Sequence, residues 1–429
     1  MTSDTAQSAG RRYILSITLT GCAFALWGFA QWLYGILISP FASALLLHAS
    51  QAYLAQWVLC LGYCLAAIPA AMLTRHFGYK SGIVFGFSCF GVGMFLFHPA
   101  AALHQFYYFL AAALVAGAGL SFLEISANPM IARLGPVESS VRRLNIAQTI
   151  IPVGGIMGFL MGGWIIQSAM QHPIAQLAHA LVQPYFAIGL VVLSFSFIVE
   201  NVEFPPVAGE RMKSGEPISQ EFVRLLSRPQ FVLGLGAICL CLVAQVTLLG
   251  LSVPYVLKFI PGLSPASAGN IILWSLIACV IGRIIGTAAM YWIDPVRLLS
   301  IFAGSAAVLT ATVTLVGGQF GVVCIVGASF FMSILFPTIF GCSIRDLGPH
   351  IKSGSALLIL AAGVGAGAMA IPNLGFALAN IRLMMLLPSL CFAAIVVFAF
   401  AFQKAATGNR GFLGLNIRIG NSARIAKQS

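Results

Sequence analysis

Residues 106–132, FYYFLAAALVAGAGLSFLEISANPMIA, form an unbroken apolar run in which Glu124 is the one charged side chain. A helix of this length rises about 40 Å, which exceeds the roughly 30 Å hydrocarbon core of a bilayer. No face of such a helix carries the polar stripe that a water-exposed helix needs. The run therefore predicts a membrane-spanning helix with an ionisable group inside it.

The rest of the chain has the same character. Of its 429 residues 60% are hydrophobic and 7% are charged, and the mean hydropathy is +0.98. A soluble domain carries roughly 25% charged residues, so this composition excludes a soluble enzyme. Short alternating segments typical of a β-barrel are absent. We expect an all-α integral membrane protein with twelve transmembrane helices, near 13–38, 51–73, 82–101, 106–132, 144–168, 182–200, 231–258, 267–292, 297–316, 319–344, 354–378 and 382–402.

Charge placement predicts the orientation. With the N-terminus inside, 19 of the 22 Lys and Arg residues fall on the cytoplasmic side. Lys258 and Arg382 fall outside, and Arg283 lies within a span. Basic residues mark cytoplasmic loops, so both termini are expected in the cytoplasm. We expect Arg283 to snorkel or to bond backbone carbonyls at the inner surface.

The longest polar stretch between spans divides them six and six. It runs from 201 to 228 and holds four glutamates and three prolines. Two short strings recur on either side of it: Ala-Ala-Met at 70–72 and 288–290, and Leu-Gly-Pro at 134–136 and 347–349. Two similar six-helix halves are common in secondary transporters. The predicted domains are an N-terminal lobe (1–200), a cytoplasmic linker (201–228), a C-terminal lobe (229–403) and a basic cytoplasmic tail (404–429).

Glu124 is the main candidate for chemistry. The other nine acids fall in loops, termini or span ends. A carboxylate at membrane depth is costly when charged and unpaired, so Glu124 is expected to be protonated, paired or facing a wet cavity. Such a group can exchange a proton and accept hydrogen bonds from hydroxyls. The alternative is a protonated carboxyl bonded to a neighbouring helix.

Polar and aromatic side chains in other spans predict a solute site. Asn128 lies one turn after Glu124, and Gln148 lies within the next span. Trp27, Gln31 and Tyr34 recur at helical spacing on one face, where rings and an amide suit a sugar. Interhelical hydrogen bonds and ordinary packing are the alternatives. Three residues of the second half form a weaker candidate set: Gln245, Asn270 and Trp274.

Small residues predict close helix packing. Gly154, Gly158 and Gly162 are spaced by four and so share one face. This face predicts either static packing or a rocking contact between the lobes. The ten cysteines all lie in apolar runs and are interpreted as packing residues, not as metal or redox groups.

Five strings carry a family resemblance: LEISANP (123–129), LGPVESSVRRLNIAQT (134–149), IGRIIGT (281–287), FMSILFPTIFGCSIRDLG (331–348) and LLPSLCF (386–392). With these strings in the same order, the chain resembles the fucose:proton symporter family of the major facilitator superfamily, which includes glucose/galactose permeases. The resemblance covers roughly residues 11–403.

The resemblance implies a twelve-helix, two-lobe major facilitator fold with alternating access. It implies that Glu124 serves sugar recognition and proton coupling and that Gln148 contacts substrate. Gly35 stands where the fucose transporter has a second acid, and Ile151 where it has an asparagine. Thr74 stands where the superfamily often has an acid.

These observations predict a proton-coupled importer of a small neutral monosaccharide, a hexose or deoxyhexose, in the bacterial inner membrane. It is expected to be a monomer in the lipid bilayer, with no cofactor beyond the proton and no nucleic-acid partner. An uncoupled sugar facilitator and a transporter-like sensor remain alternatives, since Gly35 stands where the resemblance leads us to expect a second acid. A membrane enzyme is disfavoured because no histidine stands in an HxxxxD or HExxH pattern, and a channel because no filter-like repeat is present.

Overall fold

The computed structural model describes residues 3–44, 49–103, 105–171, 174–202, 204, 215–368 and 380–406. Within these ranges the regular structure is helical, with no strand. The first helices are α1 (Ser3–Ala44), α2 (Ala49–Phe77), α3 (Tyr79–Leu103), α4 (Phe106–Arg133), η1 (Val137–Ser139), α5 (Ser140–Gln148), α6 (Ile150–Ala169), α7 (Ile174–Asn201) and α8 (Ile218–Leu226). The rest are α9 (Pro229–Phe259), α10 (Pro265–Ala289), α11 (Pro295–Leu315), α12 (Gly318–Met332), α13 (Leu335–Ile344), η2 (Gly348–His350), α14 (Ile351–Ala368), α16 (Ile381–Met384) and α17 (Leu386–Ala406).

Eleven segments of the described chain are long and apolar enough to cross a membrane. The prediction of an all-α membrane protein is therefore confirmed. The predicted span 354–378 coincides with α14 up to Ala368, and its remainder lies outside the described residues. The count of twelve spans stays a prediction, as do the exact lobe boundaries.

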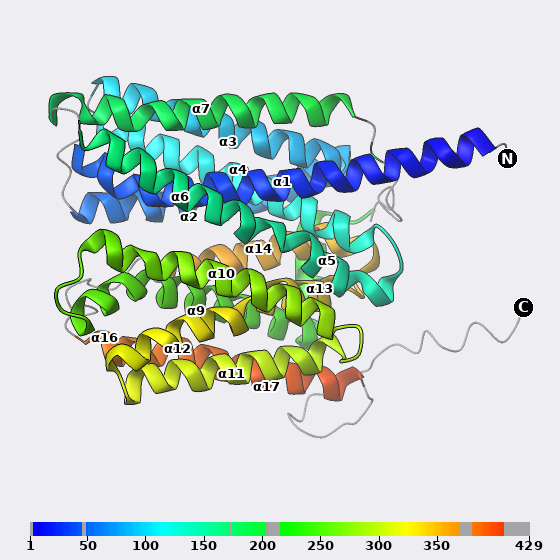
Figure 1. The fold of residues 1–429 in the computed structure, drawn as a ribbon. Helices are drawn as coiled ribbons and strands as arrows, with labels where there is room; N and C mark the ends of the chain where they lie inside the picture. Colours follow the sequence, from blue (N-terminus) through cyan, green and yellow to red (C-terminus); the bar gives the residue numbers. More distant parts are fainter. Residues whose placement is uncertain are drawn as a thin grey trace, which may run out of the picture.

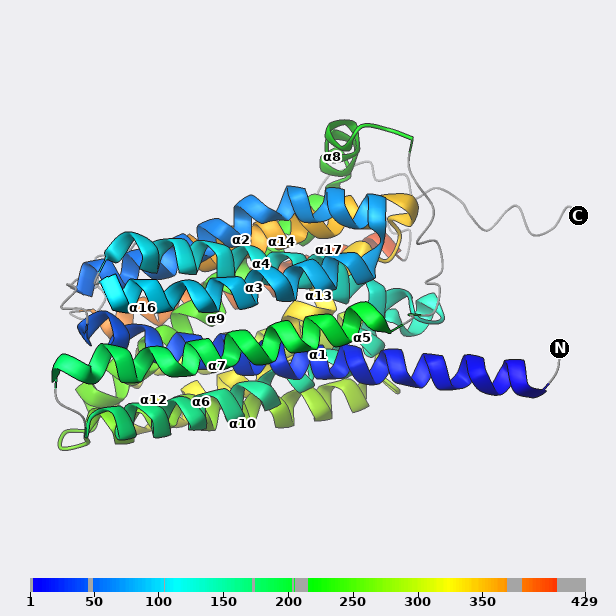
Figure 2. The ribbon, with the colours of Figure 1, turned by 90° about the horizontal axis from the view of Figure 1, so that it is seen from above.

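The helices form two groups (Figure 1). We call α1–α7 the N-terminal group and α9–α17 the C-terminal group. The N-terminal group packs mainly through α3 with α4, α1 with α6, and α2 with α4. The C-terminal group packs mainly through α11 with α17 and α12, and α9 with α14 and α17. We call the end of the bundle where α1 begins the near end, and the opposite end the far end; α8 stands at the near end (Figure 2).

Two predicted spans are interrupted where a proline removes a hydrogen-bond donor. The run 144–168 is divided into α5 and α6 at Thr149, and the run 319–344 into α12 and α13 at Ser333. In a helix each carbonyl accepts from the N–H four residues later. The residues four after Gln148 and Ser333 are Pro152 and Pro337, which have no N–H. Proline permits these interruptions but does not by itself predict them, because Pro69, Pro129 and Pro254 lie inside continuous helices.

The glycines of α6 bring its backbone against α1. A Cβ placed on Gly154 would lie 2.1 Å from the Ala25 carbonyl oxygen, and one on Gly158 would lie 2.3 Å from that of Phe29. A Cβ on Gly162 would lie 2.2 Å from Cγ2 of Ile36. The predicted close packing is confirmed. Because α1 and α6 belong to the same group, these glycines stabilise that group and are not a contact between the lobes.

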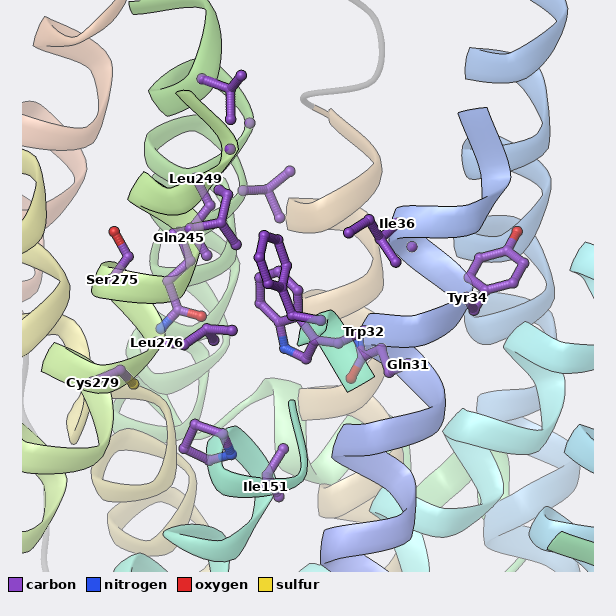
Figure 3. Close-up of a pocket in the computed structure, with 18 of the residues that line it drawn as sticks. Gln31, Trp32, Tyr34, Ile36, Ile151, Gln245, Leu249, Ser275, Leu276 and Cys279 are labelled. Carbon is purple, nitrogen blue, oxygen red and sulfur yellow. The ribbon is translucent and has the colours of Figure 1, made fainter. Parts of the chain in front are cut away.

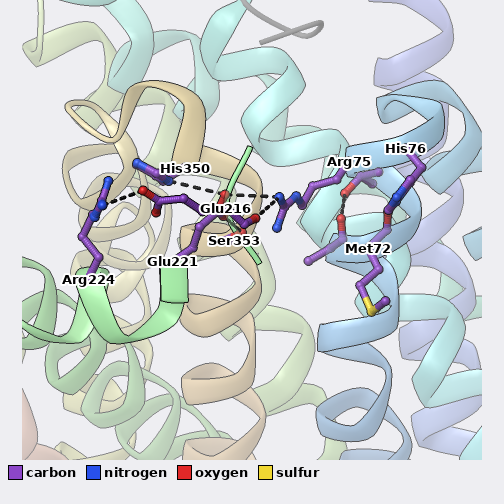
Figure 4. Close-up of polar contacts among 10 residues, drawn as sticks. Met72, Arg75, His76, Glu216, Glu221, Arg224, His350 and Ser353 are labelled. Carbon is purple, nitrogen blue, oxygen red and sulfur yellow. Dashed lines mark hydrogen bonds and ion pairs between the residues drawn. The ribbon is translucent and has the colours of Figure 1, made fainter. Parts of the chain in front are cut away.

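A buried carboxylate connects the two groups at the near end (Figure 4). Glu221 of α8 is 1% exposed. Its Oε1 lies 3.3 Å from Nη2 of Arg75 on α2 and 3.5 Å from Nδ1 of His350 in η2. The Ser353 hydroxyl on α14 donates to its Oε2. Glu221 therefore contacts α2 of the N-terminal group and α14 of the C-terminal group at once.

A second contact lies beside this carboxylate. Nζ of Lys352 on α14 donates to the Thr74 carbonyl oxygen of α2 at 2.8 Å. The same ammonium lies 4.9 Å from the centre of the Tyr79 ring. Thr74 thus contributes a backbone acceptor at the position where the superfamily often has an acid. Both connections hold the near end closed.

We predict that Gly154→Leu disrupts the α1–α6 interface, because its side chain would overlap the Ala25 backbone. Overpacking of this kind costs about 1–3 kcal/mol or more. The variant should elute as aggregate or melt at a lower temperature in detergent. Gly236→Leu is the matched control, since no atom lies within 4 Å of a Cβ there. Equal behaviour of the two variants would contradict this packing.

We also predict that Glu221→Gln lowers the midpoint of thermal unfolding, because it removes the charge that Arg75 contacts. The hydrogen bond from Ser353 to this carboxylate is weakened as well, and hydrogen bonds to charged groups contribute about 1.5–3 kcal/mol. Glu216→Gln is the control, because its pair with Arg224 is half-exposed and should contribute less than about 1 kcal/mol. A larger loss for Glu216→Gln would show that the buried carboxylate does not stabilise the near end.

Candidate functional site

A cavity of about 1380 Å³ lies between the two groups (Figure 3). Typical sites for small ligands measure roughly 300–1,000 Å³, so this cavity has room for a small solute and water. Its wall includes Gln167 near the end of α6 and Ser264 just before α10, both at the far end. Toward the near end it stops at Gln148, Arg283 and Ser333. The cavity is therefore reached from the far end and is closed at the near end.

Glu124 lies in the wall of this cavity and is partly exposed. The Tyr63 hydroxyl of α2 forms a hydrogen bond with its carboxyl group. Oε2 of Glu124 is buried and has no hydrogen-bond partner among the described residues, so a change at the wall would bring it into contact with water or a solute. An ionisable group in this position can exchange a proton with water in the cavity and still bond a solute. The structure thus places Glu124 beside an opening rather than against lipid.

Gln148 and Asn128 form a pair at the cavity wall. Nε2 of Gln148 donates to Oδ1 of Asn128 at 2.9 Å. Both residues are buried, at 2% and 0% exposed, but Gln148 lies in the cavity wall and Asn128 does not. Asn128 was predicted to contact substrate directly. The structure corrects this prediction, because the α4 side chain is covered and holds Gln148 from behind.

Helix α1 contributes the aromatic part of the wall. Trp27, Gln31 and Tyr34 all line the cavity, as their shared face predicted. The Tyr34 ring also packs 5.7 Å from the ring of Phe97, within the N-terminal group. Trp32 lines the cavity too, and Figure 3 shows its indole projecting toward the middle. Trp32 was absent from the predicted set because it lies off the helical face that joins the other three.

Helices α9 and α10 contribute the opposite wall. Gln245 and Asn270 line the cavity. Trp274 does not, and its side chain is 58% exposed on the outer surface of the bundle. The predicted contact at Trp274 is therefore corrected: this indole is exposed and does not belong to the cavity wall.

The resemblance placed two departures from the fucose transporter in this region, and both lie in the wall. Gly35 lines the cavity, and no atom lies within 4 Å of a Cβ built there. Ile151 lines it as well. These positions contribute no hydrogen-bonding side chain. The wall is thus mostly apolar, and its polar points are amides, a few hydroxyl groups, Glu124 and Arg283.

Arg283 was not among the predicted site residues, yet it forms part of the cavity floor. It is 8% exposed. Nη1 donates to the Gln148 carbonyl oxygen at 2.6 Å, and Nε donates to that of Ser333 at 2.8 Å. The expectation that this guanidinium bonds carbonyls is confirmed, but the carbonyls lie at the cavity floor and not at the membrane surface.

Comparisons with known proteins agree with this architecture. Residues 20–372 match the Major Facilitator Superfamily. The chain is 31% identical over 425 residues to the L-fucose-proton symporter of Escherichia coli strain K12, covering 94% of this chain and 96% of that protein. It is 28% identical to the glucose/galactose transporter of Brucella abortus, covering 94% and 97%.

Solved structures show the same fold. The crystal structure of the transporter FucP in the outward conformation superposes with a TM-score of 0.81 at 31% identity, covering 91% of this chain and 99% of that one. The proton:xylose symporter XylE, at 12% identity, shares the fold with a TM-score of 0.73. The chain is a multi-pass membrane transporter that belongs to the Major Facilitator Superfamily and is related to its fucose-proton symporters.

Proposed function

We propose that this transporter imports a monosaccharide, a hexose or deoxyhexose, together with a proton. The observation that supports this most directly is Glu124, an ionisable group in the wall of a cavity between two helix groups. The relatives named as fucose-proton and glucose/galactose transporters support the same substrate class.

The cavity wall suits a neutral sugar. The rings of Trp27 and Trp32 offer apolar surface for the C–H face of a sugar ring. The amides of Gln31, Gln148 and Gln245 offer donors and acceptors for hydroxyls from both groups. The guanidinium of Arg283 already donates to backbone carbonyls, so the cavity has no need of an anionic substrate to balance this charge. Gly35 and Ile151 make this wall less polar than that of the fucose transporter.

Coupling follows from linkage between the two ligands. When sugar binding and protonation of Glu124 each favour the same conformation, each ligand raises the affinity for the other. The carboxyl then takes a proton from the far end with the sugar and releases it at the near end. The cavity reached from the far end corresponds to the outward-facing state when both termini lie in the cytoplasm.

The setting proposed for this cycle is the inner membrane of a bacterium. The chain acts there as a monomer, with no cofactor beyond the coupling proton. The two lobes, 1–200 and 229–403, alternate about the cavity, and the linker 201–228 joins them on the cytoplasmic side.

A second candidate is uncoupled facilitation of the same sugars. Gly35 favours it, because this open wall position has no ionisable side chain where the fucose transporter has its second acid. In this case sugar would equilibrate without accumulating.

Reconstitution distinguishes the candidates. Purified protein in proteoliposomes should exchange labelled hexoses in counterflow. An imposed proton gradient, acidic outside, should then drive accumulation above equilibrium, and a protonophore should abolish it. Counterflow without accumulation would identify a facilitator, and absence of both across a panel of sugars would support a sensor.

We predict that Glu124→Gln retains counterflow but loses gradient-driven accumulation, because the amide binds no proton. Its exchange rate should also lose most of its dependence on external pH, whereas the wild-type rate of uphill uptake should fall as external pH rises. Glu138→Gln, an exposed acid in η1, is the control and should behave as wild type. Uphill uptake by Glu124→Gln at the wild-type level would defeat the proposed role.

A further inference from the structure

The two carbonyls at the cavity floor lack their usual helical partners. The donor for the Gln148 carbonyl would be residue 152, and the donor for the Ser333 carbonyl would be residue 337. Both residues are proline and carry no N–H. A buried carbonyl without a donor costs about 1–3 kcal/mol, and in a membrane protein no lipid group can replace it. Each break in the helices therefore creates an acceptor that must be satisfied from elsewhere.

Arg283 supplies both missing donors. Its Nη1 binds the Gln148 carbonyl at 2.6 Å, while Nε and Nη2 bind the Ser333 carbonyl at 2.8 and 2.5 Å. The guanidinium is a planar fork, so it can hold two acceptors in fixed directions. A buried cation also needs acceptors, because it has left water. The arginine and the two proline-freed carbonyls thus satisfy one another.

These bonds differ in what they join. Arg283 on α10 and Ser333 between α12 and α13 belong to the C-terminal group. Gln148 ends α5 in the N-terminal group, so the bond from Arg283 to Gln148 crosses between the groups. The bonds from Nε and Nη2 to Ser333 lie within the C-terminal group, and the bond from Nη1 to Gln148 connects the two groups.

The crossing bond continues a row of contacts along α5. Three residues earlier, Nδ2 of Asn145 donates to Oγ1 of Thr338 on α13 at 3.2 Å. Three residues before that, the guanidinium of Arg142 lies 3.9 Å from the centre of the Tyr291 ring. This row runs from the near end to the cavity floor and joins the two groups at each step. Arg283 is its innermost member and the one that touches a residue of the proposed sugar site.

We propose that Arg283 is a positioning residue that ties the conformation of the transporter to the sugar site. It fixes the backbone of Gln148, which lies in the cavity wall and whose side chain is held by Asn128. It also stabilises the state in which the near end is closed. When the near end opens, the bond to Gln148 breaks and the bonds to Ser333 remain. The freed Gln148 carbonyl has no donor in its own helix, so it needs water, which the opened near end supplies.

The part of this proposal that concerns sugar affinity rests on the proposed function, whereas the conformational part does not. Opening of the near end can be measured without sugar. Val141 of α5 is 2% exposed and packs near Gly341 of α13, so a cysteine at 141 is covered while the near end is closed. The probe is N-ethylmaleimide, and the labelled peptide is quantified by mass spectrometry so that the native cysteines do not interfere.

The first test is Arg283→Lys in the Val141→Cys background. Lysine keeps the charge but loses the fork, so it cannot hold both carbonyls in the same geometry. We expect the rate of alkylation at position 141 to rise at least tenfold, since a charge-assisted hydrogen bond is lost. Sugar affinity, read from tryptophan fluorescence, should fall as well. An unchanged alkylation rate in a folded variant would overturn the proposal.

The second test changes the acceptors and leaves Arg283 in place. Pro152→Ala restores an N–H that competes for the Gln148 carbonyl, which weakens the bond between the groups. Pro337→Ala restores the N–H that competes for Ser333, which lies within one group. We expect Pro152→Ala to raise the alkylation rate in the same direction as Arg283→Lys, and Pro337→Ala to leave it near the Val141→Cys background value.

The two proline variants keep the inference falsifiable even where Arg283→Lys fails to fold. Combining Arg283→Lys with Pro152→Ala should add little to either single change, because both act on one bond. Equal alkylation rates at position 141 in Pro152→Ala and Pro337→Ala would overturn the proposal that the bond from Arg283 to Gln148 keeps the near end closed. A protein that shows the expected alkylation but transports no sugar would refute the proposed function and leave the role of Arg283 standing.

Discussion

Lipid offers no hydrogen-bond partner, and this constraint governs every polar group described above. Backbone groups are satisfied by helices, and the exceptions need a dedicated partner. The carbonyls freed by Pro152 and Pro337 find that partner in Arg283, which in turn finds its acceptors in them. Glu124 takes the other course and faces a cavity between the groups. The two ionisable side chains Arg283 and Glu124 thus illustrate two solutions, mutual satisfaction with backbone carbonyls and a place in the cavity wall.

The contacts between the groups that involve charged side chains gather at one end. Glu221, Lys352 and Arg283 each join an element before the linker to one after it, and all lie from the cavity floor to the near end. Individually such contacts contribute a few kcal/mol at most. Two conformations are both populated when their free energies differ by only a few kcal/mol. A ligand that binds one of them more tightly can then shift the balance between them. The near end is therefore closed firmly enough to define one state and weakly enough to be reversed.

Much of this architecture could be predicted from the sequence because lipid imposes simple rules on composition. Apolar length located the spans, and the cost of a charge in lipid singled out Glu124. The same reasoning could not tell that Asn128 lies behind Gln148 or that Trp274 lies outside the cavity wall. The sequence shows which residues share a helical face, but not what that face packs against. Arg283 was recognisable as a charged residue within a span. Its partners are backbone carbonyls, which every residue has, so the residue types could not identify them. The sequence signal that was available is the pair Pro152 and Pro337, because each proline removes the hydrogen-bond donor for the carbonyl four residues earlier.

The glycine face of α6 has a mechanical consequence. Backbone lies directly on backbone where Gly154 and Gly158 meet α1, with no flexible side chain between them to absorb a displacement. Neither helix can tilt alone without collision, so α1 and α6 form a single stiff lever. A displacement of α1 near Trp27 or Gln31 is therefore expected to move α6 with it.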